Sequence, residues 1–300
     1  MEQKSSNSRL INGEQIRTFI GKRDRGLHKG DCGKVLIIAG SKGMAGAAIL
    51  CARAALRAGA GLVRVSVPDE LFPILQCAVP EATCLGRTIP PDLMNSHEAL
   101  LIGPGLGADT ANEKLIESAL TEYAGPLILD ADALNILSRS GGFHRMKKTD
   151  LVITPHTGEA ARLLVCTRAE IEADREGAVT RLAQLCGGVA VLKGAGTLVA
   201  SAAGETYKNT TGNPGMATGG SGDVLAGIIL ALAGQGLSCE KAAIAGVYLH
   251  GLAGDFAAKD LGEYGMTAAD IAARAAIAFK NTLEIDSNNG NNAHCDMDAR

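Results

Sequence analysis

The stretch Val35-Leu-Ile-Ile-Ala-Gly-Ser-Lys-Gly-Met-Ala-Gly46 carries the pattern from which the fold of this chain can be predicted. An apolar run is followed by a glycine-rich turn, a helical pattern over residues 44–58 and a second apolar run at 62–67. Continuous apolar runs rich in leucine and β-branched residues are typical of strands that are buried on both faces. The stretch therefore predicts a strand, a helix and a second strand in one βαβ unit.

The same alternation continues along almost the whole chain. Further strands are predicted at residues 99–102, 127–129, 151–154, 189–193 and 197–201, and helices at 110–123, 132–140, 157–165, 174–186, 223–234, 239–259 and 267–282. This pattern indicates an α/β fold in which a mainly parallel central sheet is flanked by helices. Because no polar linker divides the chain, we expect a single domain over residues 11–283. Residues 1–10 and the Asn-rich tail 284–300 are expected to be disordered.

Composition excludes several classes of protein. The 300 residues carry a net charge of −3, and basic clusters that would neutralise a nucleic acid are missing. The N-terminal residues resemble no secretory leader, and no uncharged run reaches membrane-spanning length. The eight cysteines form no Cys-x-x-Cys pair, so we expect reduced thiols and neither a disulfide framework nor a zinc site. We therefore expect a cytoplasmic protein that binds neither nucleic acid nor membranes.

The segment Asn213-Pro-Gly-Met-Ala-Thr-Gly-Gly-Ser-Gly-Asp223 crowds glycines just before an apolar run of helical length. Glycine lets backbone N–H groups approach a ligand closely, and the first N–H groups of a helix favour a bound anion. The segment predicts an anion site with the Asp223 carboxylate beside it. A loop that is merely capped by Asp223 is the simpler alternative.

Other glycine and polar clusters follow predicted strands at their carboxyl ends. They begin at Gly40, Gly103, Asp130, Thr154 and Lys193. Ligands of open α/β sheets bind outside this edge, near the point where the strand order reverses. The cluster at 40–46 is neither a dinucleotide fingerprint nor a P-loop, so we exclude both kinds of site.

Several side chains in these clusters have a functional and a structural interpretation. Glu159 either holds Mg²⁺, directly or through a water, or complements a helix dipole. Asp132 either lies at the sheet edge beside Asp130 or caps a helix. The cluster at 193–197 either lines a nucleotide site or is an ordinary tight hairpin. His156 lies outside the apolar strand pattern, whereas His250 lies within a predicted helix, where we expect a structural role.

Taken in order, these motifs resemble the kinase-like domain of the ADP- or ATP-dependent NAD(P)H-hydrate dehydratases, a branch of the ribokinase-like superfamily. The resemblance runs from about Arg23 to Leu283 and includes Lys29–Lys34, Gly103-Pro-Gly-Leu-Gly107, Leu129-Asp-Ala-Asp-Ala-Leu-Asn135, Thr154-Pro-His-Thr-Gly-Glu159, Leu192-Lys-Gly-Ala-Gly-Thr197 and the segment ending at Asp223. Sugar kinases of the superfamily usually have Asn where this chain has His156. In this respect the chain resembles the dehydratases and not the sugar kinases.

The resemblance implies repair of damaged nicotinamide cofactors. The S-epimer of hydrated NADH or NADPH would lose water, driven by conversion of ADP to AMP and phosphate, with ADP preferred to ATP and Mg²⁺ as the cation. A separate epimerase is expected because only about thirty residues precede the match, and relatives suggest a homo-oligomer, commonly a tetramer. By resemblance, the nucleotide would contact Lys193, Gly194, Ala195, Gly196, Thr197 and Gly222, and the hydrated cofactor would contact Ala47, Gly105, His156 and Asp223.

In the mechanism that these residues suggest, Asp223 stays ionised because the helix dipole favours the anion. It accepts the proton of the hydrate hydroxyl while that oxygen attacks the terminal phosphate, and the N–H groups of Gly220, Ser221 and Gly222 form an anion hole. Two alternatives share these motifs. One is a kinase of the same fold acting on a hydroxymethylpyrimidine or thiazole alcohol, and the other is a non-catalytic nucleotide-binding protein.

Overall fold

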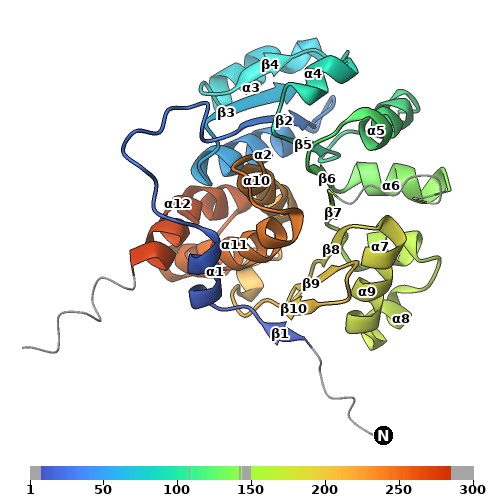
Figure 1. Cartoon of the computed structure of the whole chain (residues 1–300), viewed down its shortest axis with the longest axis vertical. Helices are drawn as coiled ribbons and strands as arrows, with labels where there is room; N and C mark the ends of the chain where they lie inside the picture. The colour runs from blue at the N-terminus through green and yellow to red at the C-terminus, as the bar shows by residue number, and fades with distance from the viewer. Residues whose placement is uncertain (1–7, 108, 142, 144–149, 285–300) are drawn as a thin grey trace, which may run out of the picture.

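The computed structural model describes residues 8–107, 109–141, 143 and 150–284. Within this part of the chain, ten strands form one sheet that has helices on both faces (Figure 1). The strands are β1 (Arg9–Leu10), β2 (Lys34–Ile38), β3 (Leu62–Ser66), β4 (Thr83–Leu85), β5 (Ala99–Ile102), β6 (Leu127–Leu129), β7 (Leu151–Ile153), β8 (Val189–Leu192), β9 (Leu198–Ser201) and β10 (Thr206–Lys208). The predicted α/β architecture with three layers is confirmed.

The order across the sheet is β1-β10-β9-β8-β7-β6-β5-β2-β3-β4. Neighbours pair in parallel except at β9, which is antiparallel to β8 and β10. The first strand of the parallel part, β2, lies between β3 and β5. From β2 the chain adds β3 and β4 on one side of the sheet, and it then adds β5 and the later strands on the other side. The strand order reverses between β2 and β5, which is where α/β sheets bind ligands.

Two layers of helices cover the sheet. One contains α1 (Gly13–Phe19), α2 (Ala45–Arg57), α3 (Phe72–Ala78), α10 (Ser221–Gly234), α11 (Cys239–Leu261) and α12 (Ala268–Glu284). The other contains α4 (Pro91–Asn95), α5 (Ala111–Glu122), α6 (Asp132–Arg139), α7 (Thr157–Leu163), α8 (Arg168–Ala173) and α9 (Arg175–Cys186). Short 3₁₀ turns are at η1 (Asp69–Leu71) and η2 (Pro214–Met216).

The strand β2 shows how the sequence makes this arrangement. Val35 and Ile37 pack into the core under α2 and α10, whereas Leu36 and Ile38 pack into the core on the other face. Successive side chains of a strand point to opposite faces, so a strand that is apolar at every position must be covered on both sides. All four side chains are fully buried.

Helix α10 is buried almost all round, which is the property that matters most for the site. From Val224 to Gly234 every residue is buried. A helix that is apolar on all sides is stable only inside a protein, and α10 packs against α2, α11 and the sheet. Its first turn, which carries Asp223, is therefore held in a fixed place relative to the carboxyl edge of the sheet.

The predicted elements agree with the structure to within one or two residues, but the shortest ones were not predicted. Sequence analysis found neither the edge strands β1 and β4, nor the strand β10 beside β1, nor the helices α1, α3, α4 and α8. These strands are two or three residues long and include polar residues, unlike the equally short but wholly apolar β6 and β7, so no pattern marks them, and they are stabilised by pairing with the rest of the sheet. The expectation of disorder is wrong for Arg9 and Leu10, which pair with β10, and for Glu284, which ends α12.

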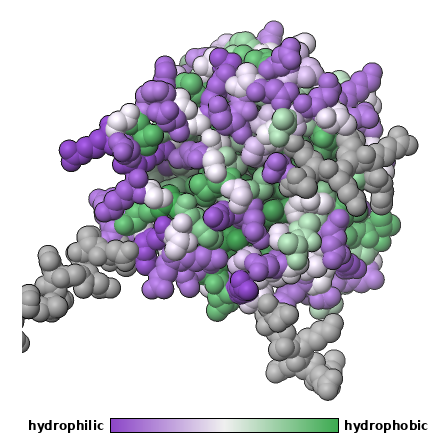
Figure 2. Space-filling view, in the orientation of Figure 1, coloured by the Kyte–Doolittle hydropathy of each residue, from purple (hydrophilic) through white to green (hydrophobic). Residues whose placement is uncertain are grey.

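Residues 1–7 and 285–300, which make up most of the expected disordered ends, lie outside the described residues. No helix among the described residues is both long enough and apolar enough to span a bilayer. On the face shown in Figure 2, hydrophobic residues gather near the centre, and hydrophilic residues dominate around them.

Candidate active site

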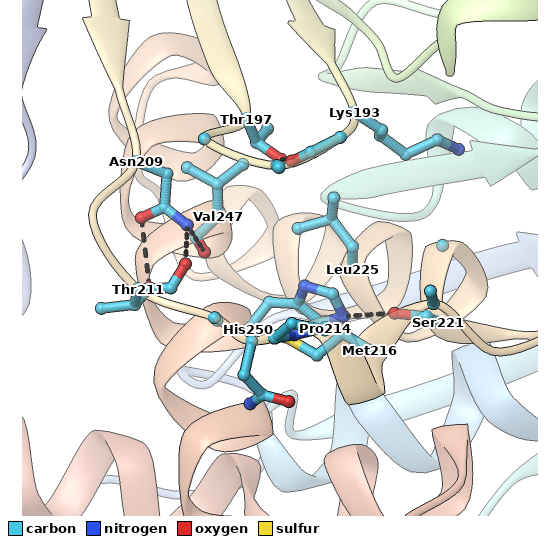
Figure 3. A pocket seen from close by; sticks show the side chains of 18 of the residues that line it. Lys193, Thr197, Asn209, Thr211, Pro214, Met216, Ser221, Leu225, Val247 and His250 are labelled. Carbon is cyan, nitrogen blue, oxygen red and sulfur yellow. Dashed lines mark hydrogen bonds between the residues drawn. The ribbon is translucent and has the colours of Figure 1, made fainter. Parts of the chain in front are cut away.

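A cavity of about 610 Å³ opens between the β8–β9 hairpin, the segment before α10 and the helix α11. Its size is in the usual range for small-molecule and cofactor pockets. Of the predicted site residues, it is lined by His156, residues 193–197, Ser221 and Gly222. Lys193 and Thr197 lie on one side of it, and Pro214, Met216 and His250 lie on the other (Figure 3). Ala47, Gly105, Glu159, Gly220 and Asp223 are not among its lining residues.

Residues 193–197 form the tight hairpin between β8 and β9, so the structural interpretation of this cluster is confirmed, and the hairpin also lines the cavity. Gly194 and Gly196 have φ of 146° and 61°, backbone angles that residues with a side chain rarely adopt. The Thr197 hydroxyl donates to the Gly194 carbonyl at 2.9 Å, and Arg175 donates to the carbonyl of Lys193. These bonds hold the backbone of the loop at the cavity wall.

Lys193 forms an ion pair at the end of β8. Its Nζ lies 2.6 Å from Asp130 Oδ1, and Asp130 is only 1% exposed. Burial by itself lowers the pKa of Lys193, but the Asp130 and Glu159 carboxylates outweigh burial, and the net shift is upward. Lys193 is therefore a fixed cation beside the cavity.

Helix α10 begins with Gly220 as N-cap, at φ 89°, so Asp223 lies in the first turn, as predicted. A Cβ on Gly222 would lie 3.1 Å from Lys193 Nζ, so the lysine ammonium is close to the backbone of this turn. The Ser221 N–H, one of the three groups of the predicted anion hole, already donates to the Thr218 carbonyl at 3.3 Å.

The expectation that Asp223 stays ionised is met only in part, because a carboxyl group with a pKa of about 7 is about half protonated at neutral pH. Burial, followed by the charge of Asp130, raises the pKa of Asp223 from 3.8 to about 7, although Lys193 opposes the shift. A helix dipole contributes about 0.3–1 kcal/mol, whereas a single pKa unit corresponds to about 1.4 kcal/mol. The dipole is therefore too weak to offset a shift of about three units.

His156 and Glu159 cap helix α7. His156 Nδ1 accepts from the Gly158 N–H at 2.9 Å, and Glu159 Oε2 accepts from the His156 N–H at 2.8 Å. Because Nδ1 is an acceptor, the ring proton is assigned to Nε2. Burial, and next the Lys193 charge, lower the pKa of His156, so the ring is neutral at pH 7. The half-exposed ring lines the cavity.

The Glu159 side chain is 5% exposed and has a structural role in this cap. Burial raises the pKa of its carboxyl group. No group of three or more His, Cys, Asp or Glu side chains among the described residues is arranged to hold a metal ion. Mg²⁺ commonly binds through one or two carboxylates together with substrate phosphates, so the residues present fit a cation that the nucleotide brings with it.

Ala47 and Gly105 meet where the strand order reverses, after β2 and β5. A Cβ on Gly105, whose φ is 57°, would lie 2.9 Å from the Ala47 Cβ. The Gly40 N–H donates to the Pro104 carbonyl at 2.8 Å, which ties the two loops together. This region adjoins α10, because a Cβ on Gly220 would overlap the side chain of Leu50 in α2. The first turn of α10 therefore contacts both this region and Lys193.

Of the two interpretations of Asp132, the helix cap is wrong, whereas the position at the carboxyl edge of the sheet beside Asp130 is confirmed. Ala131, not Asp132, is the N-cap of α6, and Asp132 Oδ2 accepts from the Gly107 N–H at 2.8 Å. It thus links the loop after β6 to the loop after β5. Asp130, the residue before this cap, points to Lys193 instead.

Gly103, the first residue of the loop after β5, provides a stability prediction. It has φ of 132°, and a Cβ there would lie 1.8 Å from the Asp130 carbonyl oxygen. We expect Gly103→Ala to lower the free energy of unfolding by about 1–3 kcal/mol, the usual cost of overpacking. Urea denaturation measures the change. Gly46→Ala is the control, since a Cβ there meets nothing within 4 Å; equal stability of the two variants would contradict the prediction.

Comparison with known proteins identifies the family of this chain. The sequence model of the NAD(P)H-hydrate dehydratase family matches residues 35–276. The chain belongs to this family. It is 41% identical over 249 residues to the ADP-dependent (S)-NAD(P)H-hydrate dehydratase of Neisseria meningitidis, covering 82% of this chain and 84% of that one.

Longer members of the dehydratase family are also similar. The bifunctional NAD(P)H-hydrate repair enzymes of Moorella thermoacetica and Escherichia coli are 43% and 45% identical over 278 and 260 residues, which is 88% and 86% of this chain. Those matches cover 52% and 50% of the relatives, so the chain spans about half the length of these curated relatives.

Solved structures agree with membership of the dehydratase family. The ADP/ATP-dependent NAD(P)H-hydrate dehydratase from Bacillus subtilis, co-crystallised with ATP/Mg²⁺, has a TM-score of 0.83 at 28% identity, covering 93% of this chain and all of that one. A ribokinase-like superfamily protein from Enterococcus faecalis V583 has the same TM-score at 29% identity, covering 95% and 99%. The ribokinase-like fold inferred by resemblance is confirmed.

Sequence analysis of this dehydratase-family chain missed the role of His250 in the wall of the cavity. His250 is 9% exposed on α11, and its Nε2 lies 3.4 Å from Ser221 Oγ, so it contacts the start of α10 (Figure 3). Burial lowers its pKa to about 4, and the ring is neutral. Its position inside a helical pattern gave no signal, because only the packing of α11 against α10 brings it to the cavity.

A polar segment after β10 was missed in the same way. Asn209 Nδ2 donates to the carbonyl oxygens of Thr211 and Val247, each at 3.1 Å. Asp255 on α11 accepts from the Gly212 N–H at 2.9 Å and from Asn213 Nδ2 at 3.0 Å. The bonds to Val247 and Asp255 fasten the cavity wall to α11, and their partners are about 40 residues apart in sequence.

Proposed function

We propose that the protein dehydrates the S-epimer of hydrated NADH or NADPH, restoring the reduced cofactor while ADP is converted to AMP and phosphate. The observation that carries this proposal is the position of Asp223. It is a partly buried carboxyl group with a pKa of about 7, in the first turn of α10, which lies close to both α2 and Lys193. Membership of the dehydratase family and the name of the Neisseria relative support the choice of reaction and of ADP.

The nucleotide is proposed to bind in the cavity, with its phosphates at residues 193–197 and Gly222. The backbone of the hairpin supplies N–H groups, and Lys193 supplies a cation. The hydrated nicotinamide is proposed to bind near Ala47, Gly105 and His156. In this arrangement the hydrate hydroxyl would attack the terminal phosphorus opposite the leaving AMP oxygen, as an in-line transfer requires.

In the proposed first step, Asp223 accepts the proton of the hydrate hydroxyl as its oxygen bonds to the terminal phosphorus of ADP and AMP leaves. The C–O bond of the resulting phosphate ester then breaks, assisted by the lone pair of the ring nitrogen, and phosphate leaves with the former hydroxyl oxygen. Loss of a proton from the neighbouring carbon restores the dihydronicotinamide. The hydroxyl oxygen ends in inorganic phosphate. A Mg²⁺ that the nucleotide brings with it would neutralise phosphate charge.

The proposal is tested by incubating the protein with hydrated NADH, Mg²⁺ and either ADP or ATP. We expect recovery of the absorbance of the reduced nicotinamide and release of one phosphate for each molecule restored, with ADP preferred. Absence of recovery with both nucleotides would overturn the proposal. A stable phosphorylated product would favour the kinase alternative instead.

The pH dependence of the reaction follows from Asp223. A base must be ionised to accept a proton, and the pKa of Asp223 is raised to about 7. We expect kcat/KM to fall tenfold for each pH unit below about 7. A pH–rate profile for the wild-type protein measures this, and a profile that stays flat down to pH 5 would contradict it.

We propose three further properties by resemblance to the family. An NAD(P)HX epimerase activity would supply the S-epimer, the protein would act as a homo-oligomer, most simply a tetramer, and it would work in the cytoplasm. Analytical ultracentrifugation checks the second property directly, and a monomer at assay concentrations would contradict it.

A further inference from the structure

The turn between β6 and α6 aims two carboxylates in different directions. Ala131, between Asp130 and Asp132, has φ 51° and ψ −113°, a backbone conformation that residues other than glycine seldom adopt. Strain of this kind persists only where surrounding contacts enforce it, and it is concentrated at functional sites. Here the contacts are the bond from Lys193 Nζ to Asp130 and the bond from the Gly107 N–H to Asp132.

Asp130 lies beneath the first turn of α10. A Cβ on Gly222 would lie 3.1 Å from Lys193 Nζ and 3.9 Å from Asp130 Oδ2, so the ion pair directly contacts the backbone next to Asp223. Because Asp130 is 1% exposed, water screens its charge little, and both its attraction for Lys193 and its repulsion of Asp223 act at close to full strength.

We propose that Asp130 is a positioning residue that acts through Lys193 and Asp223. It holds the Lys193 ammonium group against the first turn of α10, and it sets the charge environment in which Asp223 accepts the substrate proton. The catalytic part of this inference rests on the proposed function. The electrostatic part concerns the protein without substrates.

The groups that face Asp223 come from four elements. Asp130 at the end of β6 and Asp132 at the start of α6 are negative and raise the pKa of Asp223, whereas Lys193 after β8 lowers it. Cys51 on α2 is fully buried, and its own pKa is raised by burial and then by the Asp223 charge, so it stays neutral. Among these groups, Asp130 has the largest electrostatic effect on the pKa of Asp223, and only burial has a larger effect.

Loss of the Asp130 charge therefore leaves Lys193 as the dominant charged neighbour of Asp223. In Asp130→Asn, which nearly preserves shape, we expect Asp223 to titrate at least one pH unit lower than in the wild-type protein. The acid limb of the pH profile of kcat/KM should move to lower pH by the same amount. Because Lys193 is no longer anchored, kcat should also fall, whereas a purely structural role would not shift the limb.

The titration can be followed without any substrate. ¹³C NMR of protein labelled at the aspartate carboxyl carbons resolves the Asp223 signal, which Asp223→Asn identifies by its absence. The control is Asp260→Asn, which removes an exposed carboxylate that pairs with Arg274 outside the cavity and should leave the Asp223 midpoint unchanged.

An unchanged Asp223 midpoint in folded Asp130→Asn would overturn the inference. If that variant does not fold, Lys193→Met serves as the second test, and its Asp223 midpoint must move upward. A downward or absent shift there would also refute the inference. Because NMR needs no hydrated cofactor, failure of the dehydratase assay and failure of this inference are distinguishable.

Discussion

Asp223→Asn is expected to reduce kcat by about 10²–10⁴-fold while ADP binding is largely retained. The asparagine has nearly the same shape but cannot accept the hydroxyl proton, and Asp223 itself does not line the cavity in which the nucleotide is proposed to bind. Recovery of nicotinamide absorbance measures kcat, and calorimetry measures the affinity for ADP. Asp260→Asn is the matched control, because it also replaces one carboxylate by an amide.

The same substitution should not destabilise the protein at alkaline pH. The pKa of Asp223 is higher in the folded protein than in the unfolded chain, so its contribution to stability is present below pH 4 and is lost as pH rises to about 7. A shift of about three units corresponds to at most about 4 kcal/mol. At pH 8, Asp223→Asn should therefore melt at or above the wild-type temperature. A variant that is both active and less stable would refute the assigned role.

Lys193→Met is expected to lower the free energy of unfolding by about 3–5 kcal/mol, because it leaves a buried carboxylate without its cation. Lys193 is the partner of Asp130 at 2.6 Å, and Asp130 has almost no access to water. ADP affinity should fall as well, because the phosphates lose a fixed positive charge. Chemical denaturation and calorimetry measure the two effects.

The double variant Lys193→Met with Asp130→Asn separates the two causes. Once both charges are absent, no buried charge is left unpaired, so the double variant should be more stable than Lys193→Met alone. Its ADP affinity should stay low. Lys280→Met, which removes an exposed lysine of α12, is the control and should change neither quantity. If Lys193→Met and the double variant were equally stable, the ion pair would not be the source of the loss.

Much of the fold could be predicted from local pattern. The strands β2, β3 and β5 to β8 are apolar at nearly every position, so their existence, their burial and their parallel pairing follow from composition and spacing. The strands β1, β4 and β10 could not be found, since each is only two or three residues long and includes a polar residue. Their pairing comes from strands that lie up to about 200 residues away in sequence.

The candidate site divides in the same way. Glycine and charge motifs located the hairpin at 193–197, the start of α10 and the contact between Ala47 and Gly105, because each depends on a short segment with a special backbone. His250, Asn209 and Asp255 were missed, because nothing in their local sequence distinguishes them from ordinary helix or loop residues. His250 and Asn209 line the cavity and Asp255 anchors its wall only because α11 packs against these segments.

The sequence by itself determined the three-layer architecture, the family and the segments that surround the site, because each of these is encoded in contiguous residues. Only the tertiary structure decided the charge states within the site. Asp223 was expected to be ionised on the strength of its helix, but its pKa is set by burial and by Asp130, a residue 93 positions earlier in the chain. Coulomb energies depend on distance and on exclusion of water, and neither can be read from sequence.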